Sequence, residues 1–230
     1  MNACAGVDRW AQENFGTAVL GDRRRTQRLV VAAARIAEHP EKSFTQIFDW
    51  DGLRAFYNLC DQERATLKAI QQPHWQATRQ AMGRAPVVLI LHDTTTLDYT
   101  THEALSGQGP IGNDSGTGFL QHNSLAFCPD GSRLLGLVYQ QLHVRQPAPA
   151  RESRRARKKR DRESLLWLEG IRAPGKPPAG CCWVDVGDRG ADIYEAMEAA
   201  HQVSHDFLFR VCQDRVVFTD AAQTQQAYLK

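Results

Sequence analysis

Two short apolar runs, at residues 87–91 and 182–186, constrain the fold more than any other feature of this 230-residue sequence. The first reads VVLIL, and the second reads CWVDV, in which Asp185 is the one charged residue. Short β-branched runs bounded by polar or turn residues are typical of sheet strands, and the first is apolar enough to predict a strand buried on both faces. A sheet with such strands needs helices to cover it, which favours an α/β fold.

The residues around these runs complete the expected sheet. Residues 117–144 predict a β-hairpin whose turn is Pro129, Asp130 and Gly131. Helical spacing of apolar residues predicts one helix around 165–171 and another at about 191–200, and residues 207–211 predict a third apolar strand. Strand, hairpin, helix, strand, helix and strand describe a mixed α/β sheet that stays incomplete within this sequence.

Residues 8–80 carry helical signals only and predict an all-α head. Asp22 is placed to cap a helix that stops at His39 and Pro40, and Ser43 with Gln46 forms a capping-box pattern. Aromatic residues at helical spacings are expected in the core of this head rather than as platforms for nucleic-acid bases; they are Trp50, Phe56, Tyr57 and Trp75. The predicted domains are therefore 1–80, all helical, and 81–230, built on the sheet.

Composition excludes several classes of protein. No apolar run reaches the roughly 20 residues that span a bilayer, and residues 1–10 lack the pattern of a signal peptide, so a cytoplasmic protein without membrane contact is expected. The six cysteines contain no C-x-x-C pair, so neither a zinc knuckle nor a disulfide framework is encoded. The sequence also has no phosphate-binding loop, nucleophile elbow or dinucleotide fingerprint.

Positive charge is concentrated in two places, although the formal net charge is only +2. Residues 145–162 hold nine basic residues against two acidic ones, a local charge of +7 that favours a polyanion. In the predicted helix after Asp22, Arg24, Arg28 and Arg35 share one face, as on a helix that presents charge to phosphates. A solvated amphipathic helix would show the same stripe. Arginines at a helix start oppose the helix dipole, which favours the phosphate interpretation.

Aspartates follow both apolar runs, Asp93 after the first and Asp188 after the second. Carboxylates at the ends of neighbouring strands are suited to hard divalent ions, and two Mg²⁺ ions roughly 3.5–4 Å apart catalyse phosphodiester chemistry. Each aspartate could instead cap the next turn. Asp98, Asp185 and Asp192 are not expected to complete the site, and alternation along the strand turns Asp185 to the opposite face from Asp188.

A phosphohydrolase of the haloacid dehalogenase type fits some of the same residues. Asp93 with Thr95, and Gly187-Asp188 with Asp192, match its local motifs. That class requires helices alternating with parallel strands between the motifs and a lysine after a third strand. The predicted hairpin does not meet the first requirement, and the candidate lysine, Lys176, lies in a Pro/Gly-rich loop. This class therefore ranks second.

A set of motifs in one order along the chain resembles the bacterial DDE transposases of the "insertion sequence four", Tn-five-like family. The motifs are LGDRRRTQRLV (20–30), RAFYNL (54–59), LHDTTTLDYT (91–100), GPIGN with GTGFLQHNSLA (109–126), GLVYQQLHVR (136–145), ESLLWLEGI (163–171) and VGDRGADIYEAM (186–197). This resemblance implies a helical domain that binds transposon ends, then a ribonuclease H-like catalytic domain that performs cut-and-paste DNA transposition.

The resemblance also implies roles for individual residues. Asp93 and Asp188 correspond to the first two catalytic, metal-binding aspartates, with Mg²⁺ or Mn²⁺ as cofactor. The candidate DNA-binding residues are Arg23, Arg24, Arg25, Arg28, Arg35 and Arg189. Gly190 stands where the family has a glutamate, and the family's third carboxylate, in a Y-R-E-K type motif, is not found in 81–230. The expected partners are double-stranded DNA, at transposon ends and target, and a second copy in a homodimeric synaptic complex. A non-catalytic, inhibitory DNA-binding fragment is the first alternative.

Overall fold

The chain forms two compact units, residues 1–81 and 82–230, in a computed structural model that describes residues 3–112, 116–146, 151, 153, 163–220, 222 and 225–228. Most of the basic stretch at 145–162, and the prediction made on it, therefore lies outside the described residues. In the described part, no helix is long and apolar enough to cross a membrane.

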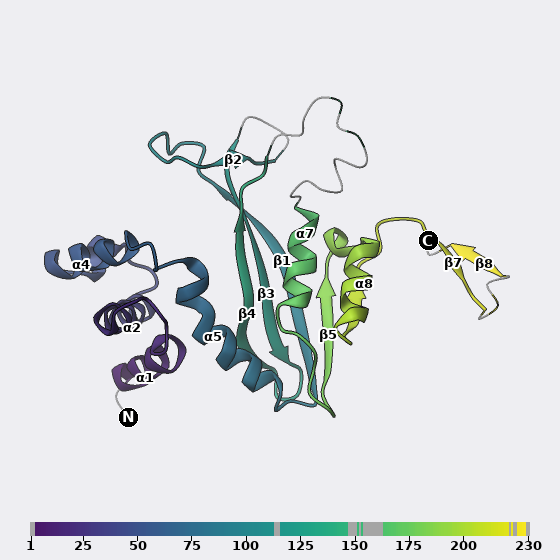
Figure 1. The fold of residues 1–230 in the computed structure, drawn as a ribbon, viewed down its shortest axis with the longest axis horizontal. Helices are drawn as coiled ribbons and strands as arrows, with labels where there is room; N and C mark the ends of the chain where they lie inside the picture. The colour runs from purple at the N-terminus through teal and green to yellow at the C-terminus, as the bar shows by residue number, and fades with distance from the viewer. Residues whose placement is uncertain are drawn as a thin grey trace. The chain divides into compact units, whose positions relative to one another are not determined.

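The first unit is helical, as the sequence predicts (Figure 1). Its helices are α1 (Ala3–Phe15), α2 (Arg23–Glu38), α3 (Phe44–Ile47), α4 (Trp50–Cys60) and α5 (Leu67–Met82), which ends at the border of the units. The Asp22 side chain accepts the Arg24 N–H and caps α2, and Ser43 with Gln46 forms the expected capping box of α3. A buried apolar cluster holds the segment before α2 against α2 and α4; its members are Ala18, Leu20, Leu29 and Leu59.

The second unit is built on a mixed sheet, which confirms the predicted α/β class. Its strands are β1 (Val87–Asp98), β2 (Gly109–Pro110), β3 (Thr117–Cys128), β4 (Arg133–His143), β5 (Cys182–Gly187) and β6 (Asp206–Phe209). The order is β2-β3-β1-β5-β6, and β4 also pairs with β3. The β1–β3 and β3–β4 pairs are antiparallel, whereas β1–β5 and β5–β6 are parallel. The predicted hairpin is thus β3–β4, and a separate small hairpin joins β7 (Val216–Phe218) to β8 (Gln226–Tyr228).

Helices pack on this sheet through small residues. They are α7 (Ser164–Arg172), the short 3₁₀ turn η1 (Arg189–Ala191) and α8 (Tyr194–Gln202). Alanines of α8 pack against Trp167 and Ile171 of α7 in one apolar cluster. Gly170 lets α7 approach β3 closely, since a Cβ there would lie 2.7 Å from Ser124 Oγ. A second apolar cluster, with Met82, Val88 and Trp183, lies where the second unit begins.

Strand β1 differs from the prediction in two ways. Its buried residues alternate, so Val88, Ile90 and His92 form a buried face while residues between them are half-buried or exposed. The strand is also longer than predicted and continues to Asp98, because its pairing with β3 runs on as far as Asp98 and Gly118. The helix predicted at about 191–200 begins only at Tyr194, because η1 occupies residues 189–191.

Candidate DNA interface and carboxylate site

An open groove runs between α2 and the α3–α4 segment of the first unit, with a volume of about 390 Å³. The exposed side chains of Arg24, Arg28 and Arg35 line its α2 wall, so the predicted stripe of arginines faces one continuous groove. Phe48 and Phe56 line the other wall, where their rings stack 5.4 Å apart. Such a groove combines an apolar wall with fixed positive charge, which suits the phosphate backbone of a nucleic acid.

Arg23 and Arg25 lie elsewhere than the stripe. Arg23 is exposed and lines a smaller pocket with residues of α1 and α2. Arg25 is half-buried, and its Nη1 donates to the Leu20 carbonyl at 3.2 Å. This bond fastens α2 to the segment that precedes it, which gives Arg25 a structural role that the sequence alone does not indicate.

Asp93 and Asp188 are neighbours on adjacent parallel strands. The β1–β5 pairing ends at His92 and Gly187, and each aspartate is the next residue of its chain. Both side chains are exposed. The sequence suggested that Asp93 ends its strand, but the strand continues beyond it. Asp93 lies where β5 stops pairing with β1, whereas β3 continues to pair with β1 and places Asn123 opposite Asp93. The register therefore brings the two predicted carboxylates to the same edge of the parallel half of the sheet.

The contacts of the two aspartates differ. Asp93 Oδ2 accepts a hydrogen bond from Thr95 Oγ1 at 3.2 Å. Asp188 Oδ1 accepts the Gly190 N–H at 2.8 Å and caps η1, so the capping alternative holds for Asp188 but not for Asp93. The other oxygen of each carboxylate has no hydrogen-bond partner among the described residues and can accept from, or ligate, a further group.

Asp185 takes part in a buried network instead. Its oxygens lie 2.9 Å from His92 Nε2 and 2.9 Å from His205 Nδ1, and all three side chains are fully buried. His205 Nε2 donates to the Gly175 carbonyl at 2.8 Å. His205 therefore bridges the Asp185 carboxyl group and the Gly175 carbonyl through its two ring nitrogens. Asp185 is therefore fully engaged between β1 and the α8–β6 turn.

Asp192 and Asp98 are also occupied. The buried Asp192 accepts the backbone N–H groups of Cys212 (2.7 Å) and Gln213 (2.8 Å) and pairs with Arg215. Burial by itself would raise the pKa of Asp192, but the Cys212 and Gln213 N–H groups and the Arg215 guanidinium together hold that pKa well below its usual range. Asp98 accepts from Thr100. Asp192 thus anchors the segment after β6, a role that no sequence motif indicates.

The surroundings of Asp188 include two further predicted positions. Arg189 is exposed directly after it. At Gly190 an added Cβ would lie 2.8 Å from the ring of Trp167, so the indole fills the space that a longer side chain would need. The glycine at this position is therefore matched to Trp167 of α7.

A divalent cation fits the carboxylate pair only in part. Within the described residues, no group of three or more His, Cys, Asp or Glu side chains could hold a metal ion. Asp93 and Asp188 supply oxygen donors, which hard cations prefer, and the remaining ligands of one ion would be water or phosphate oxygens. Two ions would need a further protein carboxylate.

A comparison with known families bears on the first unit. Residues 7–65 match the family model described as transposase DNA-binding. The matched stretch includes α2, α3 and α4, and therefore every element that lines the arginine groove. It supports a transposase N-terminus and a DNA-binding role, with DNA as the partner.

Two aromatic residues of this transposase-like unit are not where the sequence led us to expect them. Trp50 is 77% exposed and Tyr57 is 48% exposed, so the prediction that they lie in the core is wrong for both. Phe56 and Trp75 are at least half-buried, as expected. The error arises because the buried face of α4 is set by Gly52, Phe56 and Leu59, and Trp50 and Tyr57 lie on the other side of the helix.

Proposed function

We propose that this chain belongs to a DDE transposase of the "insertion sequence four" type, an enzyme of cut-and-paste DNA transposition. The observation that carries the proposal is the match at residues 7–65, which coincides with a groove lined by three exposed arginines. The neighbouring Asp93 and Asp188 add a place for metal-dependent phosphodiester chemistry. A homodimer that brings two DNA ends together is part of the same proposal.

The roles of the two units follow from their chemistry. Arg24, Arg28 and Arg35 bind phosphates of double-stranded DNA and fix its position, and Arg23 and Arg189 are further phosphate contacts. Asp93 and Asp188 would hold Mg²⁺ or Mn²⁺ through their carboxylate oxygens, and a bound ion would supply Lewis-acid chemistry at the phosphodiester. The strand order β4-β3-β1-β5-β6, antiparallel and then parallel, supports a ribonuclease H-like catalytic domain.

A non-catalytic DNA-binding protein is the second candidate, favoured by the finding that two carboxylates, and not three, meet at the sheet edge among the described residues. It would occupy DNA ends or pair with an active transposase as an inhibitor. The phosphohydrolase alternative is not supported, because an antiparallel hairpin lies between β1 and β5 and Asp192 is taken up by Arg215. Lys176 is exposed in a loop.

Salt dependence tests the DNA-binding part of the proposal. If about five phosphates are neutralised, log K for a duplex should fall with log[salt] at a slope near −4 to −5. Reversing two charges in the groove, Arg24→Glu with Arg28→Glu, should make the slope less steep by about two units and weaken binding to all sequences. Fluorescence anisotropy with a labelled duplex measures both quantities.

A matched control separates the groove from overall charge. The pair Arg84→Glu with Arg133→Glu changes the net charge equally, at two exposed positions in the second unit. We expect this pair to leave the slope close to that of the unmodified chain. An affinity that does not depend on salt, or an equal change of slope in both double variants, would refute the groove as the DNA site.

A further inference from the structure

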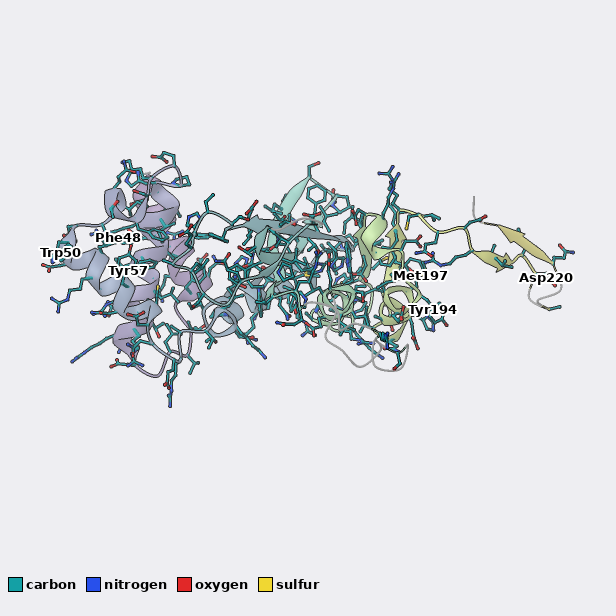
Figure 2. All side chains as sticks on the ribbon, turned by 90° about the horizontal axis from the view of Figure 1, so that it is seen from above. Phe48, Trp50, Tyr57, Tyr194, Met197 and Asp220 are labelled. Carbon is teal, nitrogen blue, oxygen red and sulfur yellow. The ribbon has the colours of Figure 1, made fainter. Side chains whose placement is uncertain are left out.

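The outer face of α4 carries an aromatic pair that the arginine groove does not use. Trp50, Arg54 and Tyr57 are all exposed and occur at i, i+4 and i+7. At about 100° per residue they fall in a sector of about 60°, on the side of the helix opposite the buried Leu59. Figure 2 shows Trp50 projecting at the margin of the helical unit.

Packing within the unit explains Tyr57 only in part, since its ring is 48% exposed although it lies 6.0 Å from the ring of Phe56, and it does not explain Trp50. Phe48 and Phe56 stack on each other, and Phe44 lies 5.0 Å from Phe56, so the aromatic cluster of α3 and α4 forms without Trp50. Trp50 makes no ring contact among the described residues. An exposed tryptophan at the first position of a helix adds nothing to the fold that a polar residue would not supply, which points to a ligand.

The charge around the pair selects the kind of ligand. Arg54 follows Trp50 by four residues and precedes Tyr57 by three on this exposed face, whereas the exposed Asp51 lies about 100° round the helix from Trp50. The opposite side of the same helix borders the groove that Arg24, Arg28 and Arg35 line. Exposed aromatic rings beside positive charge are the means by which proteins hold unpaired nucleotides, through base stacking and phosphate contacts. Paired bases inside a duplex cannot offer their faces unless they are unstacked.

We propose that Trp50 and Tyr57 form a stacking platform for unpaired bases of DNA, with Arg54 binding the intervening phosphate. Their backbone positions are about 10 Å apart along the helix axis, which a few extended nucleotides can span. The platform rests on the proposed DNA-binding function and narrows its substrate: the first unit prefers a duplex that continues into a short single strand over a blunt duplex.

The test compares two probes with the full 230-residue chain. One is a blunt duplex of about 20 base pairs, and the other is the same duplex with an overhang of about six thymidines, within the site size of one binding module. The unmodified chain should bind the overhang probe more tightly. Trp50→Ala should lower that affinity by about fivefold to a hundredfold, and Tyr57→Ala should lower it within the same range, with blunt-duplex affinity unchanged.

Control variants make the outcome specific. Trp50→Phe keeps an aromatic face and should retain most of the preference for the overhang. Tyr194→Ala removes an aromatic that is 71% exposed but lies in the second unit, and it should change nothing. The salt slope should stay the same in Trp50→Ala, because no phosphate contact is lost, and become less steep in Arg54→Ala.

The possible failures are distinguishable. Loss of arginine-dependent binding to the blunt duplex would refute the proposed function itself. Normal blunt-duplex binding with no overhang preference, or an equal loss in Tyr194→Ala, would overturn the platform alone. Concentration-dependent self-association that Trp50→Ala abolishes, without any overhang preference, would assign this face to a second copy of the chain and also overturn it.

Discussion

His122 lies in β3 with its imidazole fully buried, and its surroundings accept only the neutral form. Its Nδ1 is 2.8 Å from Thr94 Oγ1, whereas its Nε2 has no hydrogen-bond partner within the described part of the chain. A proton on Nε2 would therefore be buried without an acceptor. Burial, and then the nearby His92, lower the pKa of His122 to about 3.

This low pKa predicts a loss of stability in mild acid. In the unfolded chain the pKa of His122 is 6.5, so below that pH the unfolded chain binds a proton that the folded chain does not bind. The free energy of unfolding is therefore highest above pH 6.5 and decreases as the pH falls toward 3. The loss is about 1.4 kcal/mol per pH unit, or about 2 kcal/mol between pH 6.5 and 5. Urea unfolding of the second unit at pH 7 and pH 5 measures it.

His122→Gln provides the comparison, because glutamine does not titrate. Its absolute stability is expected to be lower, but the difference between pH 7 and pH 5 should shrink by about 2 kcal/mol relative to the unmodified chain. Equal differences in the two proteins would mean that His122 is protonated in the folded state. That result would contradict the role of burial at this position.

At the scale of elements, the carboxylate site depends on the register of β1 against β5. The pairing of His92 with Gly187 sets Asp93 beside Asp188, while Asp185 is held on the buried face by His92 and His205. The two faces therefore separate the exposed carboxylate pair, which is the proposed cation site, from the buried Asp185, whose oxygens are already engaged by His92 and His205.

Titration with Mn²⁺ tests this separation. Asp93→Ala and Asp188→Ala should each abolish binding, since each removes half of the oxygen donors. Asp185→Asn keeps a side chain of the same size in the buried network and should leave the Mn²⁺ affinity within about twofold. Electron paramagnetic resonance reports free Mn²⁺ directly, and circular dichroism checks that each variant is folded. If Asp185→Asn lost binding as fully as Asp93→Ala, the assignment of the pair would fall.

The elements differ in how far the sequence predicts them. Helix α2 was predictable because Asp22 caps it locally and His39 and Pro40 end it locally. The extent of β1 was not predictable, because residues 94–98 are polar except for Leu97 and remain in the strand through pairing with β3, twenty or more residues away. Similarly, Asp93 and Asp188 followed from their place after apolar runs, but the partners of Asp192 and Asp185, Arg215 and His205, depend on tertiary contacts that no spacing rule encodes.

At the scale of the whole molecule, the proposed function would divide DNA binding and metal-dependent chemistry between the two units. The first carries the family match and the arginine groove, and the second carries the carboxylate pair. Three apolar side chains near the end of the sheet remain exposed: Phe207 and Leu208 of β6, and Val211 shortly after it. Such a surface favours self-association at high concentration, so assays on the complete chain need dilute, monodisperse protein.

The 230-residue chain by itself should bind DNA without cutting or joining it. Phosphoryl transfer by two metal ions needs enough protein ligands to keep both ions in line with the scissile bond, and in the part of the chain that the structure describes no third carboxylate joins Asp93 and Asp188 to hold a second ion. A supercoiled plasmid, incubated in Mg²⁺ and then in Mn²⁺, should therefore stay uncut, with Asp188→Ala as the parallel control. Metal-dependent nicking that this substitution abolishes would show that another carboxylate of the chain completes the site. Glu195, in the first turn of α8, and the exposed Glu103 would be the first to replace by glutamine, because each lies in a segment that follows one of the two aspartates.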